Sequence, residues 1–308
     1  MTKKIFVAGH RGLVGSAISE QLSDNHLIQK TRQELNLQVQ SDVQIFFETE
    51  KPSEVYLAAA KVGGILANKT QKADFIYENL MIQNNIIHNA YKSGVEKLLF
   101  LGSSCIYPKN CPQPMSESDL LTGKLEETND AYAIAKIAGI MTCDSYREQY
   151  GSNFISCMPT NLYGPRDNFH LENSHVLPAM IHKFHLAKVQ NEKEVTLWGT
   201  GSPKREFLYV DDMAEACVFL MEKYNEKGLV NIGTGQDVTI KELANSIREI
   251  IGFTGEIIWD TSKPDGTPRK LLNVDKINKL GWKAKTSLQD GIEKSYQWFL
   301  DNYQNIKK

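Results

Sequence analysis

Residues 4–15 read Lys-Ile-Phe-Val-Ala-Gly-His-Arg-Gly-Leu-Val-Gly, and this stretch decides the fold. Its first five residues form a short apolar run that predicts a strand. Three glycines follow at three-residue spacing, where a helical pattern begins. In such a strand, turn and helix, Gly9 allows the tight turn, Gly12 lets the backbone approach a pyrophosphate, and Gly15 permits close packing of the helix. The helix N-terminus then faces the phosphates, so the stretch predicts a dinucleotide site.

Working outward, short apolar runs alternate with longer helical patterns through the first half of the chain, which is typical of a parallel sheet wound with helices. We therefore expect an α/β fold, a Rossmann-type doubly wound parallel sheet with a smaller, less regular α/β C-terminal lobe. The expected nucleotide-binding domain spans 1–162 and is rejoined by about 205–232, and 163–308 forms mainly the second lobe. The expected strands are 4–8, 27–30, 55–58, 97–101, 153–158, 205–210 and 229–232; the expected helices are 13–22, 42–50, 74–92, 130–150 and 288–302.

The composition is that of an ordinary globular protein, with 308 residues, 41% hydrophobic and 23% charged, which argues against disorder, coiled coil and membrane spanning. A net charge of -2 gives no general attraction to nucleic acid or to an anionic membrane. The five cysteines are scattered, without zinc-ligand spacing, so we expect a reducing cytoplasm and no metal. The N-terminal apolar run is too short for a signal peptide.

The residues after the second expected strand indicate which dinucleotide binds. An NAD site usually places an acidic residue there for the ribose diol, whereas arginine meets the 2'-phosphate of NADP. This chain has Thr31-Arg32 and no acid until Glu34, and Arg11 of the glycine loop can reach the same region. Either arginine alone would be an ordinary surface residue, but their joint position favours NADP(H).

A second group of residues predicts carbonyl chemistry. Tyr132 and Lys136 are four residues apart on an expected helix and share one face. A free phenol has a pKa of about 10, and a nearby ammonium lowers it toward neutral pH. Ser103 and Cys105 directly follow the fourth expected strand, and ligands of doubly wound folds lie beyond the carboxyl ends of strands. These four side chains should therefore face one cleft.

The glycine loop, Ser103 and the Tyr132-x-x-x-Lys136 pair together resemble the extended short-chain dehydrogenase/reductase family. The resemblance implies that Ser103 hydrogen-bonds a substrate carbonyl, that Tyr132 donates a proton to it, and that Lys136 tunes Tyr132 and binds the nicotinamide ribose. The cofactor-binding residues expected on this basis are Gly9, Arg11, Gly12, Leu13, Val14, Gly15, Arg32, Leu101, Ser103, Lys136, Pro159, Asn161, Leu162 and His175.

Within that family the chain resembles the GDP-L-fucose synthases nearly from end to end. The resemblance implies a homodimer that epimerises carbons 3 and 5 and reduces carbon 4 of a GDP-4-keto-6-deoxy sugar with NADPH. It assigns Cys105 as the base and His175 as the acid of epimerisation. The segments that carry it are 10–12, 58–64 (Ala-Ala-Ala-Lys-Val-Gly-Gly), 102–108 (Gly-Ser-Ser-Cys-Ile-Tyr-Pro), 132–136, 159–165, 173–175 (Asn-Ser-His) and the loop 263–270.

A nucleotide sugar carries two phosphates, so a nearly neutral chain must gather cations locally. The segments that resemble the substrate lobe supply cationic, aromatic and acidic candidates, and each of them alone is as readily a solvated charge or a packing residue. The expected substrate-binding residues are Lys183, Trp198, Arg205, Asp265 and Lys270, with Arg269 as a further cation.

Other functions remain open at this point. A nucleotide-sugar 4,6-dehydratase would need an Asp-Glu pair where Ser104 and Cys105 stand, so it is disfavoured. A 4-reductase without epimerase activity, or an enzyme for a related GDP-sugar such as a heptose, is harder to exclude. A non-catalytic NADP(H) sensor is the alternative from another class, although it has no need for a complete Ser, Tyr and Lys set.

Overall fold

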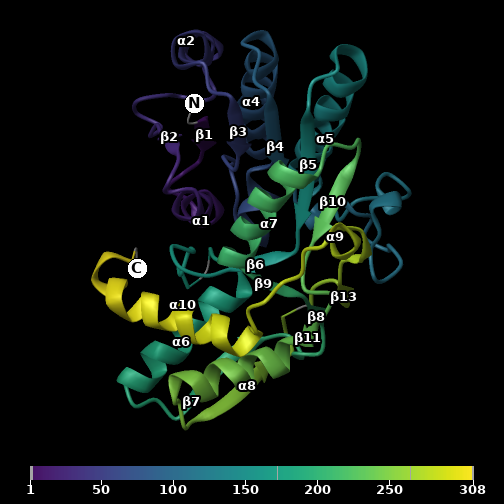
Figure 1. Cartoon of the computed structure of the whole chain (residues 1–308). Coiled ribbons are helices and arrows are strands. Elements are labelled where there is room, and N and C mark those ends of the chain that lie inside the picture. The colour runs from purple at the N-terminus through teal and green to yellow at the C-terminus, as the bar shows by residue number, and fades with distance from the viewer. Residues whose placement is uncertain (1–2, 172, 264, 307–308) are drawn as a thin grey trace.

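A six-stranded parallel sheet forms the centre of the protein (Figure 1). The computed structural model describes residues 3–171, 173–263 and 265–306. The strand order is β2-β1-β3-β4-β5-β10, so the chain leaves β1 in one direction and returns on its other side at β3. This reversal is the point at which doubly wound sheets bind ligands. The bounds are β1 Lys4–Ala8, β2 His26–Ile28, β3 Glu54–Leu57, β4 Lys97–Leu101, β5 Phe154–Pro159 and β10 Leu229–Ile232.

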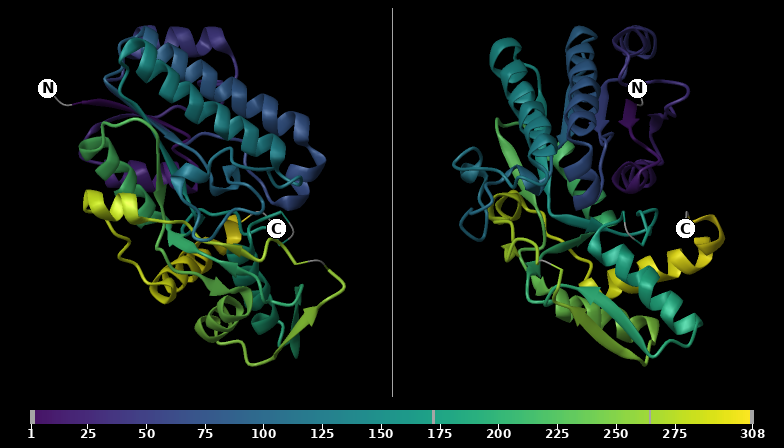
Figure 2. Two further views of the ribbon diagram at one scale, coloured as in Figure 1. Left: turned by 90° about the vertical axis from the view of Figure 1, so that its right-hand side faces the viewer. Right: turned by 180° about the vertical axis from the view of Figure 1, so that it is seen from behind.

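Helices cover both faces of this sheet, as Figure 2 shows. On one face α4 packs along α5 and against α2, and on the other α1 packs on α7. The strands β1, β3, β4 and β5 are therefore almost wholly buried and read as continuous apolar runs. The bounds are α1 Leu13–Gln21, α2 Gln40–Glu50, α3 Ile65–Thr70, α4 Lys72–Lys92, α5 Asp130–Tyr150 and α7 Val210–Lys223.

A second lobe lies below the carboxyl ends of the central strands and has its own hydrophobic core (Figure 1). Helices α6, α8 and α10 pack there around aromatic side chains such as Phe184 and Phe299, beside the strand pair β7 and β12. The bounds are β6 Asn161–Tyr163, α6 Val176–Val189, β7 Glu194–Trp198, β8 Lys204–Arg205, β9 Phe207–Tyr209, β11 Val238–Thr239, α8 Ile240–Ile251, β12 Glu256–Asp260, β13 Arg269–Lys270, α9 Asp275–Leu280 and α10 Leu288–Asn302.

The expected fold class is confirmed, and β1, β4, α5, β10 and α10 have the predicted bounds. The remaining predicted helices and strands of the first half are shifted by one or two residues at their ends. The expected strand 205–210 is wrong, because it divides into the end of β8, the separate strand β9, and Val210, which begins α7. Among the described residues, no helix is both long and apolar enough to cross a membrane.

The C-terminal lobe, which we expected to be less regular, has small sheets of two or three strands together with regular helices. Helix α8 is strongly amphipathic and begins with a capping box, in which Thr239 and Glu242 satisfy each other's backbone N–H groups. Its buried face, which includes Leu243 and Ile247, packs on α6 and α10. The lobe is thus held by regular helices, and it presents its loops to the carboxyl edge of the central sheet.

Candidate active site

The glycine loop has the geometry that its spacing predicts. Gly9 adopts a φ of +87°, which favours glycine, and a Cβ on Gly15 would lie 2.1 Å from the carbonyl oxygen of Gly9. A Cβ on Gly12 would instead meet only that oxygen, at 3.5 Å. Gly12 is the N-cap of α1 and has no side chain to occupy the free N–H groups of the first turn. The loop and helix therefore fit a phosphate-bearing cofactor, with Leu13 and Val14 in the first turn.

The side chains expected to select the dinucleotide are at the surface beside this loop. Arg11 and Arg32 are both exposed. The carboxylate of Glu34 accepts hydrogen bonds from the backbone N–H and the hydroxyl of Thr31, both at 2.7 Å, so it is turned back on its own loop. No acidic side chain follows β2 before Glu34, which agrees with a site for a 2'-phosphate rather than a ribose diol.

Ser103 joins two other candidate side chains. It directly follows β4, and its side chain lies close enough to the hydroxyl of Tyr132 and the thiol of Cys105 to influence the pKa of both. Cys105 lies in the 3₁₀ turn Ser104–Ile106, whereas Tyr132 comes from the first turn of α5. Burial raises the pKa of both Tyr132 and Cys105, and the interaction of each with Ser103 opposes that rise. The structure thus brings Ser103, Cys105 and Tyr132 together.

Lys136 lies one turn beyond Tyr132 on α5, as predicted, with its Nζ 5.8 Å from the centre of the Tyr132 ring. The Nζ donates to the carbonyl oxygen of Leu101 at 2.7 Å, and burial lowers the pKa of Lys136 to about 8. The expected lowering of the Tyr132 pKa by Lys136 is not found, because burial of the phenol dominates and raises that pKa. Lys136 nevertheless lies in reach of both Tyr132 and the end of β4.

The remaining cofactor candidates lie at the junction of the lobes. Pro159 ends β5, while Asn161 and Leu162 lie in β6, where the side-chain amide of Asn161 donates to the carbonyl oxygen of Glu206 at 2.8 Å. His175 is the N-cap of α6, and its side chain is accessible to solvent. The protein around it limits hydration of the imidazolium and lowers the pKa of His175.

The candidates for substrate binding gather in the second lobe. Trp198 is 67% exposed at the end of β7, and the Nζ of Lys183 lies 6.0 Å from the centre of its ring. Asp265 accepts hydrogen bonds from the backbone and hydroxyl of Thr200, at 2.9 and 2.7 Å. Burial lowers the pKa of Arg205, whose guanidinium lies against Gly266 of the same loop as Asp265. These residues form one cationic and aromatic region.

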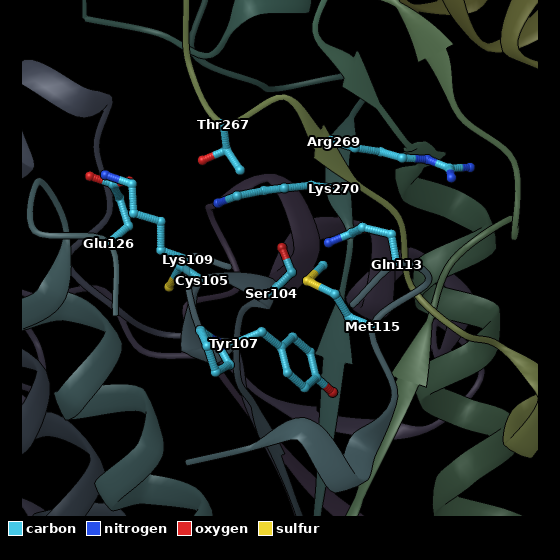
Figure 3. Close-up of a pocket in the computed structure, with 11 residues that line it drawn as sticks. Ser104, Cys105, Tyr107, Lys109, Gln113, Met115, Glu126, Thr267, Arg269 and Lys270 are labelled. Atoms are coloured by element: carbon cyan, nitrogen blue, oxygen red, sulfur yellow. The ribbon is translucent and has the colours of Figure 1, made fainter. Parts of the chain in front are cut away.

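Figure 3 shows a pocket between the Ser-Ser-Cys turn and the segment 267–270. Lys270 of β13 lines it together with Ser104 and Cys105. The neighbouring Arg269 points the other way and pairs with Asp237, so the two consecutive cations have different surroundings. Sequence reasoning missed five further lining residues, because their segment, 108–128, gives no helical or strand pattern; they are Pro108, Lys109, Gln113, Met115 and Glu126.

A doubly wound sheet with a glycine loop at its reversal point and a Ser, Tyr and Lys group beyond β4 defines an extended short-chain dehydrogenase/reductase. The chain belongs to the NAD dependent epimerase/dehydratase family, whose model matches residues 5–233.

Individual relatives narrow the comparison. The chain is 62% identical to GDP-L-fucose synthase 1 of Arabidopsis thaliana over 305 residues, which cover 98% of this chain and 94% of that protein. A GDP-6-OMe-4-keto-L-xylo-heptose reductase from Campylobacter jejuni has a similar structure, with a TM-score of 0.93, 42% identity and coverage of 98% of both chains. A GDP-L-fucose synthetase from Naegleria fowleri bound to NADP has a TM-score of 0.91, 30% identity and coverage of 99% and 96%.

Proposed function

We propose that this protein is an NADPH-dependent enzyme that epimerises carbons 3 and 5 of GDP-4-keto-6-deoxy-D-mannose and reduces carbon 4, giving GDP-L-fucose. The observation that carries the proposal is the position of the Ser103 side chain, which interacts with both the phenol of Tyr132 and the thiol of Cys105 and opposes the rise that burial gives to the pKa of each. A proton donor and a carbon base thus share one neighbour. The 62% identity to a plant GDP-L-fucose synthase supports the choice of substrate.

In this proposal the first lobe holds the cofactor. The first turn of α1 binds the pyrophosphate, Arg11 and Arg32 bind the 2'-phosphate, and Lys136 binds the nicotinamide ribose. When bound, NADPH supplies the hydride that adds to carbon 4. Pro159, Asn161, Leu162 and His175, at the junction of the lobes, border the nicotinamide end, and Leu101 anchors Lys136 through its carbonyl oxygen.

Epimerisation uses the acidity that a carbonyl gives its neighbouring carbons. The thiolate of Cys105 removes the proton from carbon 3 or carbon 5, and the electron pair moves onto the oxygen of carbon 4. Ser103 and Tyr132 donate hydrogen bonds to that oxygen and stabilise the enolate. The imidazolium form of His175 supplies a proton to the opposite face of the carbon, and the lowered pKa of His175 makes that imidazolium a stronger acid. The same donors then serve reduction, in which Tyr132 gives its proton to the oxygen of carbon 4.

The second lobe holds the nucleotide in this proposal. Trp198 offers an exposed aromatic face for the base, and Lys183, Arg205 and Lys270 supply positive charge for the two phosphates. Asp265 lies in the loop beside Arg205, where hydrogen bonds from Thr200 orient its carboxylate. This carboxylate accepts a hydrogen bond from the nucleotide.

The proposal is tested by following NADPH absorbance with GDP-4-keto-6-deoxymannose and, separately, with a GDP-4-keto-heptose. We expect rapid oxidation of NADPH with the deoxymannose and a much lower kcat/KM with the heptose. The 42% identity to a GDP-heptose reductase makes the reverse preference the alternative outcome. No oxidation with either sugar, together with tight NADPH binding, would instead indicate a sensor.

Replacing both Arg11 and Arg32 with Ala is expected to shift the cofactor preference toward NADH. Each guanidinium pairs with the 2'-phosphate, and an exposed charge-assisted hydrogen bond contributes roughly 1.5–3 kcal/mol. We expect kcat/KM for NADPH to fall by at least about tenfold, while kcat/KM for NADH stays within a factor of about two. An unchanged ratio of the two kcat/KM values would remove the 2'-phosphate assignment.

We further propose a homodimer formed through the outer faces of α4 and α5. Large apolar side chains are exposed there, with Tyr77 62%, Ile134 47% and Met141 48% exposed. An apolar stripe across two neighbouring helices is typical of a protein interface. We expect twice the monomer mass by light scattering, and the monomer mass after Ile134→Glu with Met141→Glu.

All five cysteines are free thiols, which supports a cytoplasmic location.

A further inference from the structure

The pocket of Figure 3 brings together a thiol and an ammonium group from segments that are far apart in the chain. Cys105 follows β4, whereas Lys270 lies in β13, and both line the pocket of Figure 3. The positive charge of Lys270 favours the thiolate of Cys105 and opposes the effect of burial, which raises the pKa of that thiol. The benefit depends on the separation of the two groups, because the Coulomb interaction weakens with distance. The distance between Lys270 and Cys105 therefore depends on the contacts that hold their two segments together.

The side chain of Asn231 connects the segment that follows Cys105 with the segment that follows Lys270. Asn231 lies on β10 and is fully buried. Its Oδ1 accepts a hydrogen bond of 2.5 Å from the hydroxyl of Tyr107, which directly follows the turn that holds Cys105. Its Nδ2 donates to the carbonyl oxygens of Met115, at 3.0 Å, and Asn273, at 3.2 Å. Because a carbonyl oxygen can only accept, these partners fix the orientation of the amide.

Backbone groups of residues 271–273, which follow Lys270, form several hydrogen bonds with the rest of the protein. The N–H of Leu271 donates to the side chain of Gln113 at 2.8 Å, and its carbonyl oxygen accepts from Met115 at 2.8 Å. The N–H of Leu272 donates to the buried carboxylate of Glu206 at 3.0 Å. The N–H of Asn273 returns to the carbonyl oxygen of Met115 at 2.8 Å. Residues 271–273 therefore link the side-chain amide of Asn231 to the backbone of Lys270.

The surroundings of Tyr107 are consistent with a fixed link. Its side chain is 3% exposed, and burial raises the pKa of the phenol, so the hydroxyl stays protonated and donates. Loss of Asn231 would leave this hydroxyl and the carbonyl oxygen of Asn273 without those hydrogen bonds in the interior, which is costly. The segment that follows Cys105 and the segment that follows Lys270 would then lose the side chain that bonds to both.

We propose that Asn231 is a positioning residue for proton transfer at carbon, which sets the place of Lys270 relative to Cys105 by linking Tyr107 to Asn273. It touches neither sugar nor cofactor. The proposal rests on the proposed function, since it assigns Asn231 to the epimerisation step and not to the hydride step.

The test compares Asn231→Ala and Tyr107→Phe with the unchanged protein in two reactions. The first is deuterium incorporation from D2O at carbons 3 and 5 of GDP-4-keto-6-deoxymannose, with kcat and KM measured separately. The second is oxidation of GDP-L-fucose by NADP+, which reports hydride transfer without epimerisation. Tyr224→Phe is the matched control, because it also removes a buried hydroxyl, one that donates to the carbonyl oxygen of Lys227 at 3.0 Å and accepts from the Nζ of Lys276 at 2.7 Å.

We expect both variants to lower kcat for deuterium incorporation by roughly 10- to 100-fold, the loss typical of a misplacement of about 1 Å. Hydride transfer, NADP+ binding and KM should change by less than a factor of about three, and Tyr224→Phe should match the unchanged protein. Equal slowing of both reactions, or unchanged incorporation, would overturn the proposal. If Asn231→Ala does not fold, Tyr107→Phe decides. Failure of the proposed function is distinguishable, because the unchanged protein would then incorporate no deuterium.

Discussion

Replacement of Tyr132 with Phe is expected to lower the rate of ketone reduction by about 10²- to 10⁴-fold, the range that a positioned general acid contributes. The ring should keep its place, because it packs edge-on against Phe75 with the ring centres 6.1 Å apart. Only the hydroxyl, which lies near Ser103, is removed. Burial raises the pKa of this phenol, so in the unchanged protein it is protonated at neutral pH and can act as an acid.

The loss should appear in kcat, measured by single-turnover oxidation of NADPH, and not in NADPH affinity. Lys136, the residue proposed to hold the ribose, keeps its bond to Leu101 in this variant. The control is therefore NADPH binding followed by fluorescence. If Tyr132→Phe bound NADPH poorly and reduced the ketone at a normal rate when saturated, Tyr132 would be a structural residue.

The second large effect is expected from Cys105→Ser. A serine hydroxyl is a far weaker base than a thiol, so deuterium incorporation at carbons 3 and 5 should fall by about 10²- to 10⁴-fold. Cys105 is 8% exposed, and serine has nearly the same shape, so the pocket and the proximity to Ser103 should persist. Reduction of a ketone that is already epimerised should change by less than a factor of about three.

The pH dependence gives this prediction a sign. The base is the thiolate, and burial raises the pKa of Cys105 above its ordinary value. Deuterium incorporation by the unchanged protein should therefore rise with pH through the neutral and mildly alkaline range. In Cys105→Ser that rise should be absent. Cys111→Ser is the matched control, since Cys111 is equally buried at 8% exposed. Parallel losses of incorporation and reduction in Cys105→Ser would contradict a separate carbon base.

The first half of the fold was predictable because its signals are local. The strand 4–8 and the glycines that follow it specify a turn and a helix start, and buried parallel strands read as apolar runs. The second lobe was less predictable. Helix α6 begins at Val176, after its N-cap His175, and contains Pro178 near its start, within a segment of loop-like composition. Helix α8 did carry a usable signal, the capping box from Thr239 to Glu242.

The candidate site was also predictable only in part. Ser103, Tyr132 and Lys136 could be placed from spacing and from the rule that ligands lie beyond strand ends. Their protonation could not, because the effect of burial on Tyr132 depends on packing between distant segments. Asn231 and Glu206 were also missed. Each is an ordinary polar residue in the sequence, and its importance comes from hydrogen bonds to partners 28 to 124 residues away.

The claim at the centre of the account is that one pocket, through the oxygen at carbon 4, supports both proton exchange at carbon and reduction. NMR analysis of the product formed from GDP-4-keto-6-deoxymannose and NADPH in D2O tests it most directly. We predict GDP-L-fucose with deuterium at both carbon 3 and carbon 5. A reduced GDP-6-deoxy sugar that keeps the manno configuration and carries hydrogen at both positions would contradict the account.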